Sequence, residues 1–222
     1  AAIPFTEFRL PNGMRVLMSP DKAVPVVTAA MIFDVGGRHE ARGRSGFAHL
    51  FEHLMFAGSA HAPKGSFDRI LEGHGAVNNA STHLDFTFYY ETLPAHVLPV
   101  AFWLDADRVS ALDVSEQNMR NQVDVVQDER RMKVDNRPYA PLLWVEIASR
   151  SFANWANAHP TIGSYEDLRA ATLGDVRAFF ERISPYERFH ASGTFKSCAY
   201  DVTRSPSTVT MWRYCAPAGR ID

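Results

Sequence analysis

The sequence predicts one domain that combines β-strands with amphipathic helices. The chain has 222 residues, 46% of them hydrophobic, which is enough apolar material for one sizeable core. The pair Asn12-Gly13 separates the segments 8–10 and 15–18, and this is the pattern of a tight β-hairpin. The β-branched run Val26–Val35 ends at Gly36-Gly37 and predicts a buried strand that leads into a turn.

The elements that follow are mainly helices. Residues 66–72 carry apolar side chains on one side and predict a short helix, which the glycines of 73–75 end. The aromatic and threonine-rich segment 86–93 predicts a strand and is a candidate for the edge of the sheet. Trp103 and Trp144 lie on apolar helix faces, so we expect both in the core. Apolar periodicity and capping boxes predict further helices over residues 94–110, 115–134 and 142–152, from 164, and from 172 to about 183.

The tail from Ser184 differs from the rest of the chain. Proline and glycine interrupt it, and only residues 208–214 are strand-like. Its two cysteines, Cys198 and Cys215, have neither the CxxC nor the Cys/His spacing of a zinc knuckle, and nothing indicates a disulfide.

Composition excludes two classes of partner. A net charge of -2 and a pI near 6.5 provide no electrostatic footprint for nucleic acid. The longest apolar runs, such as Val26–Phe33, are far shorter than the roughly 20 residues of a membrane span. The chain begins Ala1-Ala2-Ile3-Pro4 without a leader, which fits a processed, exported chain, for instance a periplasmic one, or a trimmed chain; a cytoplasmic location stays open.

The strongest functional motif is His49-Leu50-Phe51-Glu52-His53. Residues four apart on a helix lie one above the other, so His49 and His53 can direct two imidazoles to one point. Glu52 flanks that point and can reach a water bound to a metal there. The order HxxEH is that of inverzincin zinc sites. The alternative is a set of surface or hydrogen-bonded core groups, and a third ligand is needed to favour zinc over it.

Glu129, in the predicted helix 115–134, is the candidate third ligand. HxxEH followed by a helical glutamate at this distance resembles the pitrilysin or insulinase family of zinc metallopeptidases, which includes the mitochondrial processing peptidases. The resemblance covers about residues 5–183 and extends to flanking stretches. These are Gly43-Arg44-Ser45-Gly46, Asn79-Ala80-Ser81-Thr82, Asp107-Arg108, Asp135-Asn136-Arg137-Pro138-Tyr139 and Thr161-Ile162-Gly163-Ser164.

The resemblance implies an α+β fold, in which an antiparallel sheet is covered by helices. It implies a catalytic-type domain over residues 1–183, followed by a divergent or truncated tail over residues 184–222. Active members usually pair this domain with a second one of similar fold that closes over the cleft. We therefore expect a second pitrilysin-type domain or subunit, or self-association.

The resemblance also implies roles for individual residues. His49, His53 and Glu129 would bind one zinc ion, and Glu52 would be the general base that takes a proton from water. The substrate would be a peptide bound as an added strand, in contact with the segment Asn79-Ala80-Ser81. One departure concerns Gln122, which stands where members often carry a second glutamate, two helical turns before the metal-binding one.

Two classes of function follow from these expectations. In the first, the chain is the catalytic half of a zinc endopeptidase that hydrolyses peptides or unfolded polypeptide segments. In the second, it is a non-catalytic scaffold or binding subunit of a two-part peptidase. The filled catalytic positions favour the first class, because a scaffold has no physical need for an open zinc site.

Overall fold

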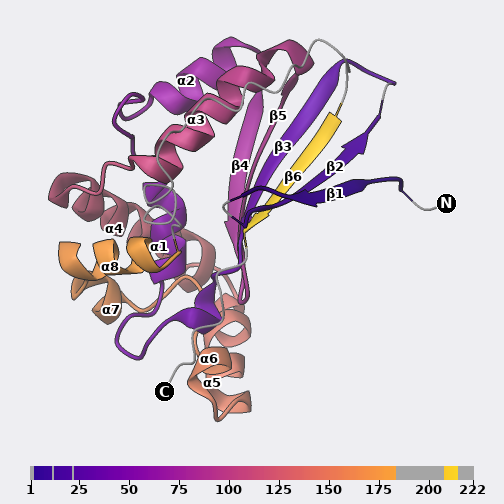
Figure 1. The fold of residues 1–222 in the computed structure, drawn as a ribbon. Coiled ribbons are helices and arrows are strands. Elements are labelled where there is room, and N and C mark those ends of the chain that lie inside the picture. Colours follow the sequence, from indigo (N-terminus) through magenta and orange to yellow (C-terminus); the bar gives the residue numbers. More distant parts are fainter. Residues whose placement is uncertain (1–2, 12, 22, 184–207, 215–222) are drawn as a thin grey trace.

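A six-stranded sheet forms one side of the molecule, and helices gather on the other side and at one end of it (Figure 1). The computed structural model describes residues 3–11, 13–21, 23–183 and 208–214. In spatial order the strands are β1 (Thr6–Arg9), β2 (Arg15–Pro20), β6 (Thr208–Tyr214), β3 (Val26–Phe33), β5 (Thr87–Pro94) and β4 (Val77–Thr82).

The N-terminal hairpin and the strand-like part of the tail both belong to this sheet. β1 pairs antiparallel with β2, with Thr6 opposite Met18, as the Asn-Gly signal predicts. The segment 208–214 forms β6 in the middle of the sheet, antiparallel to β2 and parallel to β3. The other pairs are antiparallel, so the expected α+β fold with a mainly antiparallel sheet is confirmed.

The expectation of an edge strand at residues 86–93 is wrong. β5 covers this segment and lies between two strands, because Tyr90 is opposite Ala30 of β3 and opposite Asn79 of β4. The edge is formed by β4, which pairs only with β5 among the described strands. Aromatic and threonine-rich composition indicates a strand but does not determine its neighbours, since these depend on long-range pairing.

The predicted helices are present. Ser115 and Ser164 cap two of them, because their hydroxyls accept hydrogen bonds from the backbone N–H of Asn118 and Asp167. The helices are α1 (Phe47–Leu54), α2 (Ser66–Gly73), α3 (Leu98–Ser110), α4 (Glu116–Arg130), α5 (Ile147–Ser151), α6 (Trp155–Ala158), α7 (Tyr165–Arg169) and α8 (Leu173–Ile183), with 3-10 turns at Gly37–His39 and Ala95–Val97 and π-helical turns at Arg131–Asp135 and Leu142–Glu146.

Helix α1 lies at the centre of the larger core cluster. Its buried side chains Leu50, Phe51 and Leu54 pack with residues of the sheet, such as Tyr89, and of α4, such as Val126. α1 contacts both β4 and β5 on the sheet and also α4. This packing holds the segment with the HxxEH motif between the edge of the sheet and the longest described helix.

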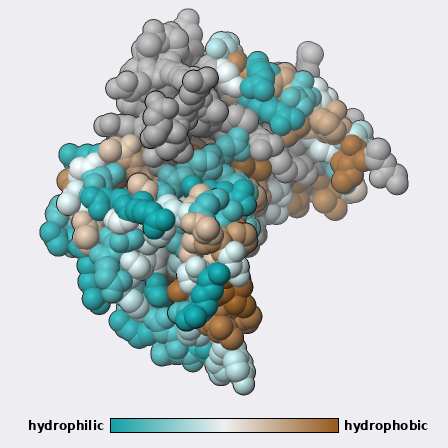
Figure 2. Space-filling view, turned by 90° about the horizontal axis from the view of Figure 1, so that it is seen from below, coloured by the Kyte–Doolittle hydropathy of each residue, from teal (hydrophilic) through white to brown (hydrophobic). Residues whose placement is uncertain are grey.

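The two tryptophans expected in the core are exposed instead. Trp103 keeps 47% of its surface accessible and Trp144 66%. Trp144 belongs to a group of exposed apolar residues over 139–147, and Figure 2 shows hydrophobic side chains gathered on the face seen from the α5 and α6 end. Helical periodicity identifies an apolar face, but it does not say what that face packs against. No helix of the described residues is long and apolar enough to cross a bilayer.

Candidate metal centre

The HxxEH motif lies on α1, and its two histidines are on the same face of that helix. The His49 and His53 ring centroids are 4.8 Å apart. Gly46 begins the helix at a φ of 87°, a left-handed conformation that favours glycine. The apolar residues between the histidines are buried, so burial of the opposite face orients both imidazoles toward α4.

Helix α4 brings Glu129 to the two histidines. Oε2 of Glu129 lies 3.1 Å from Nε2 of His53 and 3.5 Å from Nε2 of His49. All three residues offer a ligand atom within 4.8 Å of one another. The side chains of His49, His53 and Glu129 are 12%, 20% and 17% exposed, so the group is mostly buried but still reached by solvent. The structure thus brings together the three residues predicted to bind zinc.

The charge states of these groups fit a metal. Burial, followed by the charge of His53, lowers the pKa of His49 to about 4, so that imidazole is neutral near pH 7. The hydrogen bond with His53, followed by that with Lys133, lowers the pKa of Glu129 to about 2 in spite of partial burial. A neutral imidazole and an ionised carboxylate are the forms in which these side chains donate to Zn²⁺. The residues present therefore fit a zinc ion chemically.

Glu52 directly precedes His53 on α1 and lines the same cavity as that histidine. Burial raises the pKa of this carboxyl above 4.5, against a hydrogen bond that the Thr82 hydroxyl of β4 donates to Oε2. A carboxylate with a raised pKa is a better proton acceptor near neutral pH than a solvated one. Glu52 therefore has the chemistry of a general base, and the edge strand holds it in place.

A cavity of about 240 Å³ opens beside these residues. Of the three residues expected to contact the substrate, Asn79 and Ala80 of β4 line this cavity, and their contact with a substrate stays a prediction. Ser81 does not line it, and its hydroxyl lies 3.0 Å from Nε2 of His83. Oδ1 of Asn79 accepts a hydrogen bond from the backbone N–H of Ala80 at 2.8 Å. The cavity is lined by Glu52, His53, Phe56, Asn79, Ala80 and Gln122.

Three residues at the site were not predicted from the sequence. Thr82 bonds to Glu52, Phe56 lines the cavity, and Nζ of Lys133 lies 2.7 Å from Oε1 of Glu129. A signal existed for Lys133, because Glu and Lys four residues apart on a helix form ion pairs. Phe56 had none, and Thr82 belonged to the resembling stretch 79–82 without an assigned role, since its contact with Glu52 depends on how β4 packs against α1.

Comparison with known proteins agrees with this arrangement. The family model described as Insulinase (Peptidase family M16) matches residues 15–161. The chain is 31% identical over 171 residues to the "Zinc protease PqqE" of Helicobacter pylori, a match that covers 77% of this chain and 38% of that protein. It is 25% identical over 182 residues to "Cytochrome b-c1 complex subunit 1, mitochondrial" of Bos taurus, covering 82% of this chain and 37% of that protein.

A solved structure shows the same fold. The crystal structure of a protease from Helicobacter pylori matches with a TM-score of 0.80 and 26% identity, over 95% of this chain and 46% of that one. The chain thus spans less than half the length of these relatives. The match of the family model over most of the described domain, together with these relatives, shows that the chain belongs to the insulinase family, peptidase family M16.

Proposed function

We propose that this chain is the catalytic half of a zinc-dependent endopeptidase that hydrolyses peptides or unfolded polypeptide segments. The observation that carries the proposal is the convergence of His49, His53 and Glu129 from two helices to within 4.8 Å, beside Glu52. The family membership and a relative named as a zinc protease support it.

His49, His53 and Glu129 are the proposed ligands of one zinc ion. When bound, zinc polarises a carbonyl oxygen and lowers the pKa of water. Three protein ligands leave a position open, which is typical of catalytic rather than structural zinc sites. Lys133, paired with the second oxygen of Glu129, holds this carboxylate in its ionised form.

Glu52 is the proposed general base. Its carboxylate accepts a proton from the water that attacks the peptide carbonyl and passes that proton to the leaving amine. The Thr82 hydroxyl donates to Oε2 and restricts the rotation of the carboxylate, which leaves Oε1 as the proposed proton acceptor. Burial raises the pKa of Glu52, which makes its carboxylate a stronger proton acceptor near pH 7.

The free edge of β4 is the proposed binding site for the substrate. An extended peptide can add to a sheet edge through main-chain hydrogen bonds. Asn79 and Ala80 lie on this edge and also line the cavity beside Glu52, so a peptide paired with β4 passes the proposed zinc ligands. β5 is excluded from this role because both of its sides are already paired.

A second domain or subunit completes the proposed peptidase. The chain covers 46% of the Helicobacter pylori protease structure, and the proposed zinc ligands His53 and Glu129 remain partly exposed. A second domain of similar fold, or a second copy of the chain, would cover these ligands and enclose the peptide.

The alternative function is a non-catalytic scaffold or binding subunit. One specific observation favours it, since a relative is named as a subunit of the cytochrome b-c1 complex and not as a protease. A scaffold has no physical need for three ligand-type side chains within 4.8 Å of one another beside Glu52, so we place it second.

One experiment separates the two functions. Zinc content is measured on the purified chain by elemental analysis, and cleavage of a fluorogenic peptide library is measured on the same sample, with and without a chelator. We expect about one zinc per chain and cleavage that stops when the chelator removes the metal. Zinc without cleavage, also after addition of the second half, would favour the scaffold, and a native chain without zinc would refute the metal site.

A further inference from the structure

A buried carboxylate outside the cavity caps the helix that carries the HxxEH motif. The backbone N–H groups at the start of a helix have no partners within that helix, and Gly46 has no side chain to bond to them. Glu40 supplies the partner. Its Oε2 accepts from the N–H of Gly46 and its Oε1 from the N–H of Ala48, both at 2.8 Å. The Glu40 side chain is completely buried, so both bonds are shielded from water.

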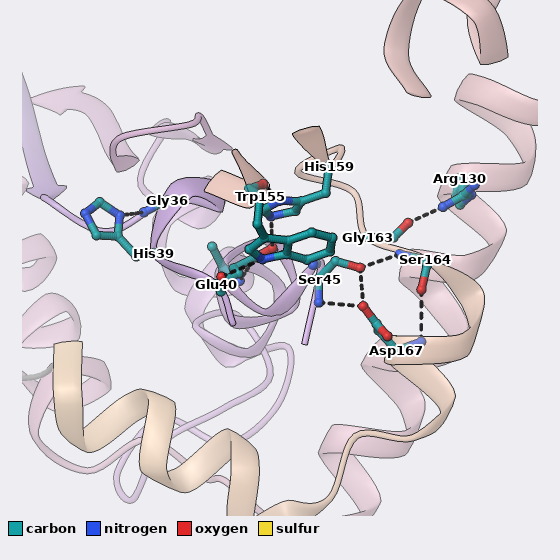
Figure 3. A network of polar contacts seen from close by, with 12 residues as sticks. Gly36, His39, Glu40, Ser45, Arg130, Trp155, His159, Gly163, Ser164 and Asp167 are labelled. Carbon is teal, nitrogen blue, oxygen red and sulfur yellow. Dashed lines mark hydrogen bonds and ion pairs between the residues drawn. The ribbon is translucent and has the colours of Figure 1, made fainter. Parts of the chain in front are cut away.

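His159 holds Glu40 in this position (Figure 3). Its Nε2 lies 3.0 Å from Oε2 of Glu40 and its Nδ1 lies 2.7 Å from the carbonyl oxygen of Trp155. Both ring nitrogens thus face acceptors, which indicates an imidazolium that donates on both sides. The Trp155 ring stacks on that of His159 at 4.2 Å, and its Nε1 donates to the carbonyl oxygen of Glu40.

The segment 159–164, which His159 begins, also contacts the start of α1. Ser45 accepts a hydrogen bond from the N–H of Ser164 and donates its hydroxyl to Asp167. The backbones of Gly46 and Gly163 touch, and a Cβ on Gly46 would lie 2.7 Å from Cα of Gly163. Such a separation leaves no room for a side chain at Gly46.

The same segment reaches the helix of the third ligand. Arg130 follows Glu129 on α4 and donates to the carbonyl oxygen of Gly163. Its side chain is 13% exposed, and its Nε lies 3.7 Å from Oδ1 of Asp135, so the guanidinium is held against the protein rather than in solvent. Segment 159–164 therefore joins the N-terminal end of α1 to α4 at the position next to Glu129 (Figure 3).

We propose that Glu40 and His159 are positioning residues of the metal centre. They fix the first turn of α1, which contains His49, relative to Glu129 on α4. The inference rests on the proposed function, since it concerns zinc affinity. His49 is the third residue of the helix and His53 lies in its last turn, so loss of the cap displaces His49 more than His53. Groups that orient metal ligands usually change metal affinity by about 10-fold to 100-fold when removed.

The test compares Glu40→Gln with a matched control, Asp107→Asn. Asp107 is also a buried carboxylate that accepts a backbone N–H, a hydroxyl and a histidine ring, from His61 and Ser59. None of these residues belongs to α1 or to segment 159–164. Both variants lose a buried charge, so both are expected to unfold at a lower temperature than the wild type.

The readouts on the full chain are zinc affinity by chelator competition and the visible absorption spectrum with Co²⁺ in place of zinc. Both are measured below the unfolding temperature of every variant. We expect Glu40→Gln to bind zinc at least about tenfold more weakly and to alter the Co²⁺ spectrum, whereas Asp107→Asn matches the wild type. His159→Gln keeps one donor for Glu40, so its zinc affinity should decrease less than that of Glu40→Gln. It replaces Glu40→Gln as the test variant if Glu40→Gln does not fold.

The outcomes distinguish the inference from the function on which it rests. Wild-type affinity in both Glu40→Gln and His159→Gln, or an equal loss in Asp107→Asn, would overturn the positioning role and leave the zinc peptidase intact. A wild-type chain that binds no zinc would overturn both. Weaker binding limited to the Glu40 and His159 variants supports the inference, whether or not the chain cleaves peptides.

Discussion

Nε2 of His53 lies 3.1 Å from Oε2 of Glu129, although the two residues belong to different helices. α1 and α4 pack against each other, and this packing is what brings an imidazole and a carboxylate from distant parts of the chain together. The contact therefore shows that the packing of α1 against α4 brings the two side chains to one point.

Removal of a proposed ligand should abolish tight zinc binding. We expect His49→Ala and Glu129→Ala each to weaken zinc binding by more than about 100-fold, because the loss of a direct ligand exceeds the effect of an outer partner. Elemental analysis and chelator competition measure the change. His74→Ala is the control, since His74 is exposed and bonds to the carbonyl oxygen of Ile70. Equal zinc content in His49→Ala and the wild type would rule out His49 as a ligand.

Replacement of the proposed base should slow peptide hydrolysis without loss of bound zinc. Glu52→Gln keeps the shape of the side chain and its acceptor for Thr82 but cannot take a proton near pH 7. We expect peptide hydrolysis to fall by about 100-fold to 10,000-fold with zinc retained. Single-turnover cleavage and metal analysis on the same preparation measure both effects. Turnover at the wild-type rate in Glu52→Gln would exclude this residue as the base.

Asn79 should affect substrate binding and leave the metal unchanged. Asn79→Ala removes one side-chain hydrogen-bonding group from the cavity, worth about 1 kcal/mol, so kcat/KM should fall about fivefold. The neighbouring Asn78→Ala is the control, because the Asn78 side chain bonds to Asp68 and does not line the cavity. The same kcat/KM in Asn79→Ala and the wild type would remove Asn79 from the substrate site.

The second half of the enzyme should raise activity. If β4 binds the peptide on an open side, a domain that covers this side adds contacts to the substrate and excludes water. We expect peptidase activity to appear or increase when the chain is mixed with the remaining part of the full-length protein, or to depend on chain concentration through self-association. Gel filtration with light scattering and an activity titration test this. Full activity from a stable monomer would contradict the proposed division into halves.

The buried charge cluster of Arg108, Glu91 and Asp105 should make the stability of the fold depend on pH. Arg108 contacts the carboxylates of Glu91 and Asp105, both at 2.6 Å. One guanidinium does not neutralise both acids, and burial, followed by the charge of Asp105, raises the pKa of Glu91 to about 8. The folded state therefore keeps a proton that the unfolded state releases near its ordinary pKa of 4.5. The bound proton therefore adds to the free energy of unfolding. This contribution is fully present below pH 4.5 and is lost as the pH rises to about 8.

The variant Glu91→Gln tests this pH dependence, because its amide is neutral at every pH. We expect the melting temperature of the wild type to decrease between about pH 5 and pH 8, and that of Glu91→Gln to change less over the same range. Differential scanning fluorimetry measures both, and Glu72→Gln, at an exposed position, should follow the wild type. Parallel curves for the wild type and Glu91→Gln would show that Glu91 is ionised throughout.

The sequence alone determined the local features. These features depend on residues close together in the chain. They are the Asn-Gly hairpin, the serine-capped helices, and the placement of His49 and His53 on one helix face, which follows from helical periodicity. Glu129 was identified through family resemblance, because no local rule joins α4 to α1.

The tertiary structure decided the rest, since those features depend on contacts between distant segments. It placed β4 rather than β5 at the edge, exposed Trp144, and brought Thr82 to Glu52. It also paired Glu40 with His159, two residues whose sequence surroundings indicate no contact. Sequence therefore predicts which side chains can bind a metal, whereas packing determines how they are held and where a substrate can approach.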